Sequence, residues 1–510
     1  MERDGARISL WQADMPGYVP VSRDFPLELF DVAIIGGGIT GLATAVQLQK
    51  NGKKCVVVEK STIGFGSTGG TTAHFNTFFD TTYDQVQKDF GKENAWLLHE
   101  AAIEALNTLE SNIRDYNIAC DFEYKDAYLF AKDKKQAEEL DRIVKASQEA
   151  GLRIAYSGDI LIDRPFEKAA LIEQQAQFHP VRYVYALANA FEKGGGVILQ
   201  GCMMESFDDD ELPITVKTSS GVIHSRQLVF ATHIPPGLNI LHFRCAPYRS
   251  YVLAVKLKND AYPGGLVYDM DVPYHYYRTQ RIGGQQYLVF GGEDHKTGHD
   301  EDAYSHFGNL ETYLGTHFDL EEVSYRWSSQ FYEPGDGLAY IGRFPGHSEN
   351  VFVATGFGGD GMPYSHMAAK LLGDLILHGQ SRYEKLFDPG RIKPIAGFSS
   401  FVSENADVIK EFIAKRISIE KVENLDELAP GEARIIRYKG EQIAVYRNDS
   451  GILMAIDPVC THARCIVQWN NAEKTWDCPC HGARYTVEGE ILTGPATRKL
   501  GEIEMDVPAE

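Results

Sequence analysis

Cysteine and histidine residues gather in two short segments near the C-terminal end of the 510-residue chain. The segments are CTHARC at 460–465 and CPCHG at 478–482. Each offers one cysteine and one histidine, at C-x-H spacing in the first and C-x-x-H spacing in the second. Two thiolates on one iron and two imidazoles on the other form a 2Fe–2S centre with a raised reduction potential. A structural zinc site uses the same residue types, but it does not explain the extra cysteine in each segment. The predicted ligands are Cys460, His462, Cys478 and His481.

Residues 417–510 resemble Rieske proteins of the respiratory cytochrome bc type. The resemblance assigns the same four ligands and implies a disulfide between Cys465 and Cys480 that braces the cluster loops. It also implies that GPATRKL at 494–500 covers the cluster and that Tyr485 hydrogen-bonds a cysteine sulfur. Ala483 stands where high-potential members have a serine, so we expect a lower potential than in the respiratory proteins.

A glycine motif, Gly36-x-Gly38-x-x-Gly41, separates a short apolar run from a helical segment. Such glycines permit a tight turn that brings a pyrophosphate close to the N-terminus of a helix. Glu59, at the end of the next apolar run, is placed to accept hydrogen bonds from ribose hydroxyls. The pattern predicts a dinucleotide site and leaves NAD and FAD open.

Residues 28–385 resemble the FAD-dependent superfamily of D-amino-acid oxidase, glycine oxidase and sarcosine dehydrogenase. Besides the glycine motif, the resemblance rests on GSTGGTTAHF at 66–75, QLVFAT at 227–232, the stretch 326–343, and ATGFGGDGM at 354–362. It implies FAD as cofactor, with a second glycine turn near the flavin ring. His233 departs from the pattern, because many members have glycine there. The further FAD-binding residues implied are Thr71, Thr72, Asp336, Gly342, Gly356, Gly358, Gly359 and Met362.

His74 belongs to a GGTTAH stretch that resembles the one carrying covalent FAD in dimethylglycine and sarcosine dehydrogenases. The resemblance makes His74 a candidate attachment point for the flavin 8α-methyl group, although Ala73 replaces the family's tryptophan. The alternative is a histidine packed beside the flavin or hydrogen-bonded in the core.

The superfamily oxidises C–N bonds, so the resemblance implies hydride transfer from the carbon next to nitrogen of an amine or amino acid. Arg278 lies on a strand where amino-acid-oxidising relatives place the arginine that binds the substrate carboxylate, a task that suits a guanidinium. Tyr251, Tyr274 and Tyr276 are candidates for the pocket wall, where they could stack on a substituted ammonium. The alternatives are a structural arginine and tyrosines on one face of a sheet.

Asp294, His295 and His299 raise a second metal possibility, since two histidines and a carboxylate hold the mononuclear iron that accompanies some Rieske clusters. Neighbouring glycines at 291, 292 and 298 argue against a helix that would bring these side chains to one face. We expect a turn near the flavin or a domain interface instead.

The element pattern predicts an α/β plus β fold. A Rossmann-like FAD-binding domain is interleaved with an antiparallel-sheet substrate domain and followed by a small all-β Rieske domain. Helices are expected at 84–114, 134–150 and 402–415, and antiparallel strands from 245 to 330. The predicted divisions are a surface strap at 1–29; FAD-binding segments at 30–105, 165–245 and 326–385; substrate segments at 106–164 and 246–325; a linker and helix at 386–416; and the Rieske domain at 417–510.

Acidic residues outnumber basic ones, 71 to 50, for a formal charge of −21. That sign makes nucleic acid and anionic membrane surfaces poor partners. With no bilayer-spanning apolar run and no secretory signal visible, we expect a cytoplasmic protein. The scattered cysteines, expected as buried core thiols, are Cys55, Cys120, Cys202 and Cys245.

Together the motifs predict an FAD-dependent amine or amino-acid dehydrogenase or oxidase. The flavin takes two electrons from the substrate, and the cluster lets them leave singly to a redox partner protein or a small acceptor. Two other functions fit the same motifs: a reductive flavoenzyme fed by the cluster, and an electron-transfer or redox-sensing protein with little catalysis of its own.

Overall fold

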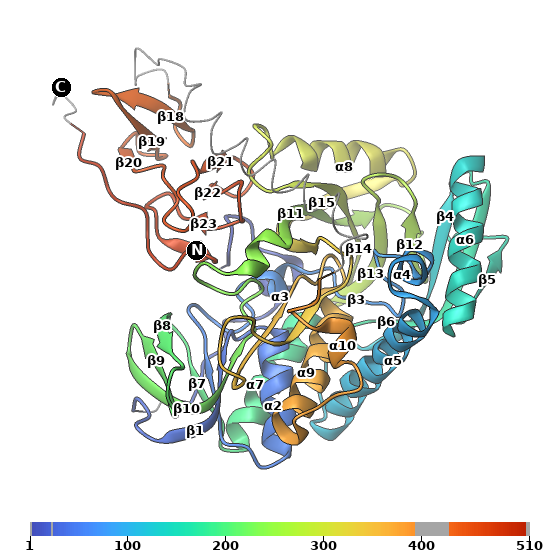
Figure 1. The fold of residues 1–510 in the computed structure, drawn as a ribbon. Helices are drawn as coiled ribbons and strands as arrows, with labels where there is room; N and C mark the ends of the chain where they lie inside the picture. Colours follow the sequence, from blue (N-terminus) through green and yellow to red (C-terminus); the bar gives the residue numbers. More distant parts are fainter. Residues whose placement is uncertain (1–2, 22–23, 393–427, 506–510) are drawn as a thin grey trace.

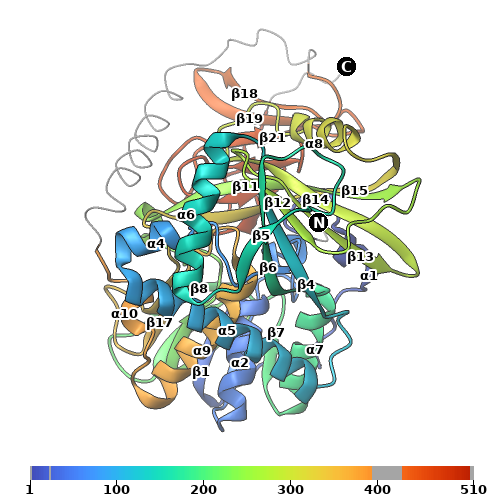
Figure 2. The ribbon, with the colours of Figure 1, turned by 90° about the vertical axis from the view of Figure 1, so that its right-hand side faces the viewer.

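The computed structural model describes residues 3–21, 24–392 and 428–505. Figure 1 shows an α/β domain in its lower half, a domain built on a large sheet at the right, and short C-terminal strands at the upper left. Figure 2 shows that α6 and strands β4 to β6 form the outer edge of the second domain. The predicted fold class is confirmed.

The α/β domain is built on an eight-stranded sheet whose central strands are parallel. Val32 and Ile34 pack into one core cluster and Ala33 and Ile35 into another, so both faces of the sheet are covered. This double burial explains the continuous apolar runs in the sequence. The strands, in sheet order, are β16 (Tyr340–Arg343), β17 (Val351–Thr355), β10 (Gly221–Phe230), β1 (Leu29–Ile35), β2 (Cys55–Val58) and β7 (Val197–Leu199), with β9 (Ile214–Thr218) and β8 (Met204–Asp208) beside β10.

Helices cover this sheet and connect it to the second domain. In Figure 1, α2, α7 and α9 lie side by side over one face, and α2 contacts both of the others. The predicted helices at 84–114 and 134–150 are present. The helices are α1 (Leu10–Asp14), α2 (Ile39–Lys50), α3 (Ser67–Gly70), α4 (Tyr83–Phe90), α5 (Lys92–Asp115), α6 (Lys134–Ala150), α7 (Pro180–Lys193), α8 (Ser305–Gly315), α9 (Gly361–His378), α10 (Glu384–Phe387) and the 3-10 helix η1 (Ile240–Phe243).

The second domain is a nine-stranded, mainly antiparallel sheet. It includes β3, β6 and all of β15, so it differs from the predicted boundaries, which place 165–245 and 326–385 in the FAD-binding domain. The strands, in sheet order, are β15 (Leu320–Pro334), β11 (Cys245–Leu257), β14 (Gln285–Lys296), β13 (Tyr276–Ile282), β12 (Leu266–Asp269), β4 (Glu123–Ala131), β6 (Lys168–Gln177) and β3 (His74–Phe75), with β5 (Ile154–Ser157) beside β6.

The start of the N-terminal segment is buried, which corrects the predicted surface strap there, whereas Val19 and Leu27 are 84% and 91% exposed. Trp11 is fully buried and donates its indole N–H to the Thr71 carbonyl at 2.6 Å. Arg3 and Asp4 are each 1% exposed, pair with each other and contact the C-terminal domain. The polar sequence did not indicate this burial, because two of the partners of Arg3 and Asp4 are distant in the chain.

The C-terminal domain consists of two small antiparallel sheets. The helix predicted at 402–415 lies outside the described residues. The first sheet contains β18 (Ala433–Tyr438), β19 (Glu441–Arg447) and β20 (Leu453–Ile456), and the second contains β21 (Gln468–Asn470), β22 (Thr475–Asp477), β23 (Arg484–Tyr485) and β24 (Ile491–Thr493).

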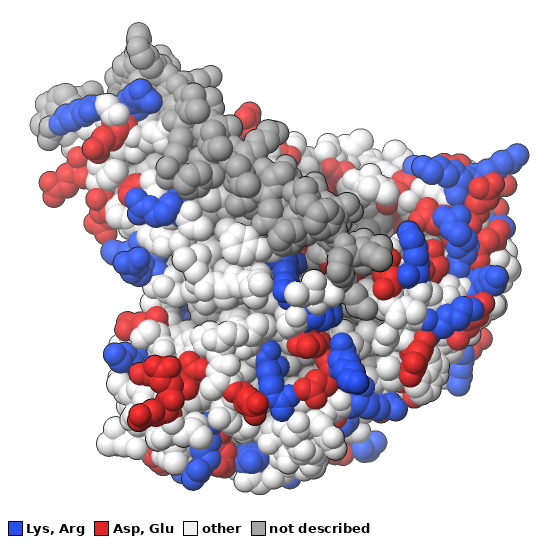
Figure 3. Space-filling view, viewed as in Figure 1, with Lys and Arg blue, Asp and Glu red and all other residues white. Residues whose placement is uncertain are grey.

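Cys55, Cys120, Cys202 and Cys245 are buried and unbridged, as predicted. Within the described ranges, no helix is both long enough and apolar enough to cross a bilayer. On the face in Figure 3, Lys and Arg are interspersed with Asp and Glu, and neither sign forms a continuous surface.

Candidate functional site

A cavity of about 570 Å³ lies where the three domains meet. It is lined by the glycine motif, by residues of the nine-stranded sheet, and by the C-terminal segment 491–497 with the exception of Pro495. Because one cavity receives residues from all three domains, a bound cofactor there would be enclosed by the folded chain rather than by one domain.

The first glycine turn forms the end of this cavity at the carboxyl end of β1. Gly36 has φ +113°, and a Cβ added to Gly41 would lie 1.9 Å from the Gly36 carbonyl oxygen, so a side chain at 41 is excluded. Gly36, Gly38 and Glu59 line the cavity. The Glu59 carboxylate accepts from the N–H groups of Gly37 and Ser61, both at 2.7 Å. Burial raises the pKa of Glu59. This cradle fits the adenosine and pyrophosphate of FAD.

The second glycine turn, between β17 and α9, forms another part of the wall. Gly358, with φ +55°, and Gly359 and Met362 all line the cavity. A Cβ on Gly359 would lie 2.5 Å from Asp80 Oδ2, so only a bare backbone fits there. The turn therefore leaves space for a ring system against the main chain.

Four residues implied by the resemblance shape the site from outside the cavity wall: Gly41, Asp336, Gly342 and Gly356. Asp336 pairs with Arg391 through two hydrogen bonds of 2.7 and 2.8 Å. Gly356 has φ +69° and begins the second glycine turn. Because these residues lie outside the cavity wall, they shape the glycine turns and do not contact a cofactor in the cavity directly.

His74, Thr71 and Thr72 line the cavity. Tyr268 Oη lies 2.7 Å from His74 Nδ1, while His74 Nε2 is buried and has no hydrogen-bond partner among the described residues. Burial lowers the pKa of His74, so the ring is neutral at pH 7. A neutral imidazole that lines a cofactor cavity and keeps one nitrogen without a partner among the described residues fits either attachment to the flavin or close contact with it.

Arg278 does not reach the cavity, and this corrects its predicted role as a carboxylate clamp. Its guanidinium is fully buried and donates to the carbonyls of Thr72, Ala73 and Phe178 at 2.7, 2.9 and 3.2 Å. The Trp11 ring covers it, with 5.1 Å between the guanidinium carbon and the ring centroid. Arg278 therefore holds the backbone of the loop that precedes His74.

Tyr251 also lies away from the cavity, whereas Tyr276 faces it. Ser250 and Val252 line the cavity, and Tyr251 between them points to the opposite face of β11, since side chains alternate along a strand. Its hydroxyl lies 3.0 Å from His295 Nε2. Tyr276 Oη lies 2.8 Å from Ser250 Oγ.

Acidic side chains gather beside the second glycine turn. Asp80 Oδ2 accepts from the Gly359 N–H at 3.0 Å, and Asp80 Oδ1 accepts from Tyr274 Oη at 3.0 Å. Asp294 faces the same cavity, and its Oδ1 is buried without a hydrogen-bond partner among the described residues. Burial raises the pKa of Asp294 to about 7. Asp80 belongs to no recognisable sequence motif, so nothing in the sequence signals that it lies in the site.

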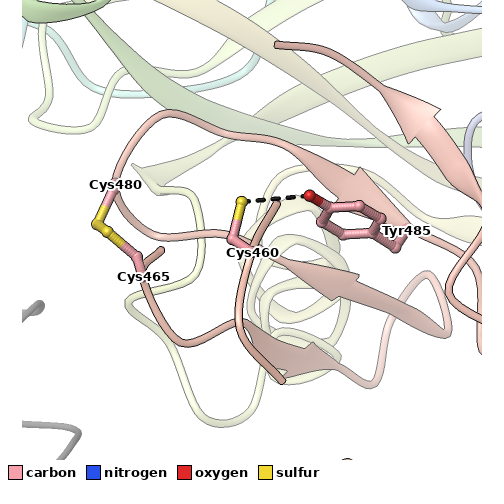
Figure 4. Close-up of a disulfide and its surroundings, with 4 residues drawn as sticks. All are labelled: Cys460, Cys465, Cys480 and Tyr485. Atoms are coloured by element: carbon pink, nitrogen blue, oxygen red, sulfur yellow. Dashed lines mark hydrogen bonds between the residues drawn. A yellow bond between two sulfur atoms is a disulfide. The ribbon is translucent and has the colours of Figure 1, made fainter. Parts of the chain in front are cut away.

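The predicted cluster residues form a buried pocket in the C-terminal domain. Figure 4 shows Cys460 directed toward the Tyr485 hydroxyl, with 3.2 Å from Sγ to Oη, and the disulfide between Cys465 and Cys480. Cys478 is buried and unbridged. His462 Nδ1 and His481 Nδ1 are buried without partners among the described residues. Two free thiols and two free imidazole nitrogens are the donor set that a Rieske cluster needs.

This pocket is joined to the cavity through short contacts. Gln330 and Tyr332 line the cavity; Gln330 Nε2 donates to the Gly482 carbonyl at 2.9 Å, and Tyr332 Oη donates to the His481 carbonyl at 3.3 Å. Lys60 Nζ donates to the carbonyls of Ile491 and Leu492 at 2.8 and 2.7 Å. The main chain of one cluster ligand therefore touches the cavity wall.

The second candidate metal site has a different composition from the expected one. His295, Asp300 and His306 come together, with ligand atoms within 4.8 Å of one another. Both ring nitrogens of His306 already contact carboxylates, at 2.9 Å to Glu293 and 2.8 Å to Asp300. The two imidazoles stack with 11° between their planes. Gly298 packs near Pro479, which matches the expected turn at a domain interface.

His233 has φ +70°, a backbone conformation that favours glycine. This accounts physically for the glycine that related sequences place there. Here the imidazole Nδ1 lies 3.1 Å from Ser67 Oγ, and the ring lies edge-on to Tyr332 with 4.8 Å between centroids.

A dinucleotide cradle joined to a Cys/His cluster pocket defines a flavoprotein with an iron–sulfur domain. Residues 31–375 match the family described as FAD dependent oxidoreductase, and residues 418–504 match the Rieske [2Fe-2S] domain. The chain therefore belongs to the FAD dependent oxidoreductase family and carries a C-terminal Rieske domain. The predictions of FAD and a Rieske 2Fe–2S cluster as cofactors are confirmed.

A relative that aligns over nearly the whole chain is the putative Rieske 2Fe-2S iron-sulfur protein YhfW of Bacillus subtilis strain 168. The two are 33% identical over 97% of this chain and 96% of the relative. The gamma-glutamylputrescine oxidoreductase of Escherichia coli K12 is 24% identical over 74% of this chain and 90% of its own. The solved glycine oxidase of Geobacillus kaustophilus has a TM-score of 0.59 at 18% identity, covering 71% of this chain and 99% of that one, and shares the fold.

Proposed function

We propose that the protein is an FAD-dependent dehydrogenase of amines, whose electrons leave singly through the Rieske cluster to an external acceptor. The bound flavin supplies acceptance of a hydride, and the cluster supplies one-electron transfer. The amine nitrogen gives up its proton, the adjacent carbon gives up hydride, and water hydrolyses the resulting imine. The acceptor is a redox partner protein or a small molecule.

The observation that carries this proposal is the acidic wall beside the second glycine turn. Asp80 and Asp294 can attract a protonated amine, and Asp294 can take its proton, since its pKa lies at about 7. Tyr274 and Tyr276 add phenol rings suited to a cationic nitrogen. The acidic wall thus supplies negative charge to attract a protonated amine and a carboxylate to accept its proton.

The same wall favours an amine over an amino acid. Among the described residues that line the cavity, Lys60 is the only lysine or arginine, and it adjoins Glu59 at the first glycine turn. Burial lowers its pKa to about 8. A substrate carboxylate beside Asp80 and Asp294 would meet like charges and no guanidinium. Relatives named for glycine, L-proline and gamma-glutamylputrescine leave the choice open.

His74 is proposed as a flavin contact and candidate covalent attachment point. His74 lines the cavity, its Nε2 has no hydrogen-bond partner among the described residues, and Tyr268 orients the ring through Nδ1. Arg278 supports this position from outside by holding the carbonyls of Thr72 and Ala73.

The test is anaerobic mixing of the holoprotein with substrate pairs that differ only by a carboxylate, such as methylamine with glycine and pyrrolidine with proline. We expect an amine, and not its amino-acid counterpart, to bleach the flavin absorbance, followed by the EPR signal of the reduced cluster. Asp80→Asn should slow bleaching. Asp84→Asn serves as the matched control, since Asp84 lies outside the cavity and bonds Thr82.

Bleaching by amino acids alone would contradict the amine assignment. Absence of bleaching by every amine, with reduction only by a protein donor, would contradict oxidation altogether. That result would favour the reductive or electron-transfer functions.

A further inference from the structure

The two histidine ligands of the Rieske domain face the α/β domain of the same chain. His242, on η1, has ring centroids 4.6 Å from His462 and 5.8 Å from His481. Phe243 lies 5.8 Å from His481 on its other side. His481 is 4% exposed. The loop before β11 therefore covers the histidine side of the cluster pocket.

A direct contact joins His242 to a ligand. His462 Nε2 lies 3.1 Å from His242 Nδ1 and 3.2 Å from the Gly237 carbonyl oxygen. Because a carbonyl only accepts, His462 carries its proton on Nε2, which leaves the buried Nδ1 for iron. The tautomer needed for ligation is thus selected by the α/β domain.

The tautomer of His242 follows in the same way. Its Nε2 lies 2.8 Å from the Pro235 carbonyl and so carries the proton. Asn239 Nδ2 lies 3.2 Å from the same nitrogen, a longer contact that the Pro235 bond overrides. With Nε2 protonated, Nδ1 has a free lone pair. His462 Nε2–H therefore donates to His242 Nδ1.

We propose that His242 is a positioning residue for the cluster, which holds His462 through this hydrogen bond and thereby tunes the cluster from a different domain. An acceptor on the far nitrogen makes a ligating imidazole more electron-rich, and outer hydrogen bonds of this kind orient metal-bound histidines. An electron-rich ligand stabilises oxidised iron, so His242 lowers the reduction potential. The proposal needs the Rieske cluster but does not depend on amine oxidation.

The test is a dye-mediated redox titration of the purified holoprotein, following the EPR signal of the reduced cluster, with dithionite as reductant and no substrate. His242→Phe keeps a ring but removes the acceptor, so we expect its midpoint potential to rise and the g-values to shift. His242→Asn places a carbonyl oxygen close to the position of Nδ1 and should restore the wild-type potential. Ile240→Ala changes a side chain of the same 3-10 helix that is 48% exposed, and it should leave the potential unchanged.

If His242→Phe fails to assemble a cluster, His242→Ala provides a second measurement. Its potential should rise and return toward the wild-type value when imidazole is added. A potential that is unchanged in both deletion variants would overturn the proposal. An equal rise in Ile240→Ala would overturn it as well, because loop packing rather than the hydrogen bond would then set the potential.

Discussion

Asp4 links the N-terminal segment to the Rieske domain inside a buried group of charges. Its carboxylate contacts Arg3 at 2.7 Å and Arg484 at 3.2 Å, and all three side chains are at most 1% exposed. Arg484 also pairs with Asp477 at 3.1 Å, and Arg3 with Glu473 at 3.3 Å. Arg249, also fully buried, lies 3.7 Å from Asp477, so three arginines face three carboxylates. Asp4→Asn keeps the shape of the side chain and removes its charge, so the group acquires one uncompensated positive charge.

The expected cost follows from this geometry. Removing one partner of a buried ion pair costs about 3–5 kcal/mol, because a charge is left in a poorly solvated site. Arg3 and Arg484 each keep a second carboxylate, which places Asp4→Asn at the lower end, about 3 kcal/mol. That is a factor of about a hundred in the equilibrium constant, since each 1.4 kcal/mol is about tenfold.

Asp14→Asn is the matched control, because it removes another Asp–Arg pair of the same segment. Asp14 lies 2.8 Å from Arg182, but the side chains are 16% and 26% exposed, and such pairs contribute about 0–1 kcal/mol. Thermal unfolding followed by the visible circular dichroism of the cluster should show a midpoint lower by about 3 °C for Asp4→Asn, since the unfolding entropy is about 2.1 cal/mol/K per residue and the chain has 510 residues. The control should stay within about 1 °C of the wild type.

The pH dependence gives an independent check. Burial alone would raise the pKa of Asp4, but Arg3 and Arg484 more than offset it and hold the pKa below the ordinary value. A depressed pKa in the folded state contributes stability above the unfolded value of about 4, and that stability is lost as pH falls further. The gap between wild type and Asp4→Asn should therefore narrow below about pH 4. Equal effects of the Asp4 and Asp14 substitutions at pH 7 would refute the reasoning.

Three further predictions concern the two cofactor sites. Because burial raises the pKa of Asp294 to about 7, kcat/KM for an amine should rise with pH through about 7, and Asp294→Asn should remove this inflection; an unaltered profile would exclude Asp294 as the proton acceptor. Wild-type protein should retain flavin fluorescence on a denaturing gel and His74→Ala should lose it, whereas release of flavin from the wild type would show non-covalent binding. Cys465→Ser opens the disulfide to Cys480 and should speed loss of the visible cluster absorbance several-fold in air; identical decay would mean that the loops hold the cluster without it.

The spacing of cysteine and histidine in the sequence was enough to predict the cluster site. Ligands at C-x-H and C-x-x-H positions lie within two loops, so local chain geometry already brings each cysteine near its histidine. The glycine turn at 36–41 and Glu59 were predictable for the same reason, since one β-strand, one turn and one helix place them. These predictions needed no knowledge of how distant segments pack.

Of the three catalytic candidates, Tyr276 lines the cavity, whereas Arg278 and Tyr251 do not, because packing of distant segments decides their surroundings. Arg278 lies on the same face of β13 as Tyr276, and only the docking of Trp11 and of residues 72–73 over it diverts its donors. Tyr251 lies on the face of β11 opposite the cavity, and the sequence does not show this because its neighbours, the polar Ser250 and the apolar Val252, share the cavity face. Asp80 enters the site only when α9 docks against the loop before α4.

The sequence by itself determined the family and both cofactors, and it predicted the cluster ligands, because these depend on short spacings and on residue chemistry. Tertiary structure alone decided which side chains line the cavity, how the start of the N-terminal segment is buried, and that His242 touches His462. Each of those contacts joins residues far apart in the chain, by as many as 480 positions between Asp4 and Arg484. No local sequence pattern predicts such a pair, because the interaction energy between the two side chains arises only when folding brings them together and removes both from water.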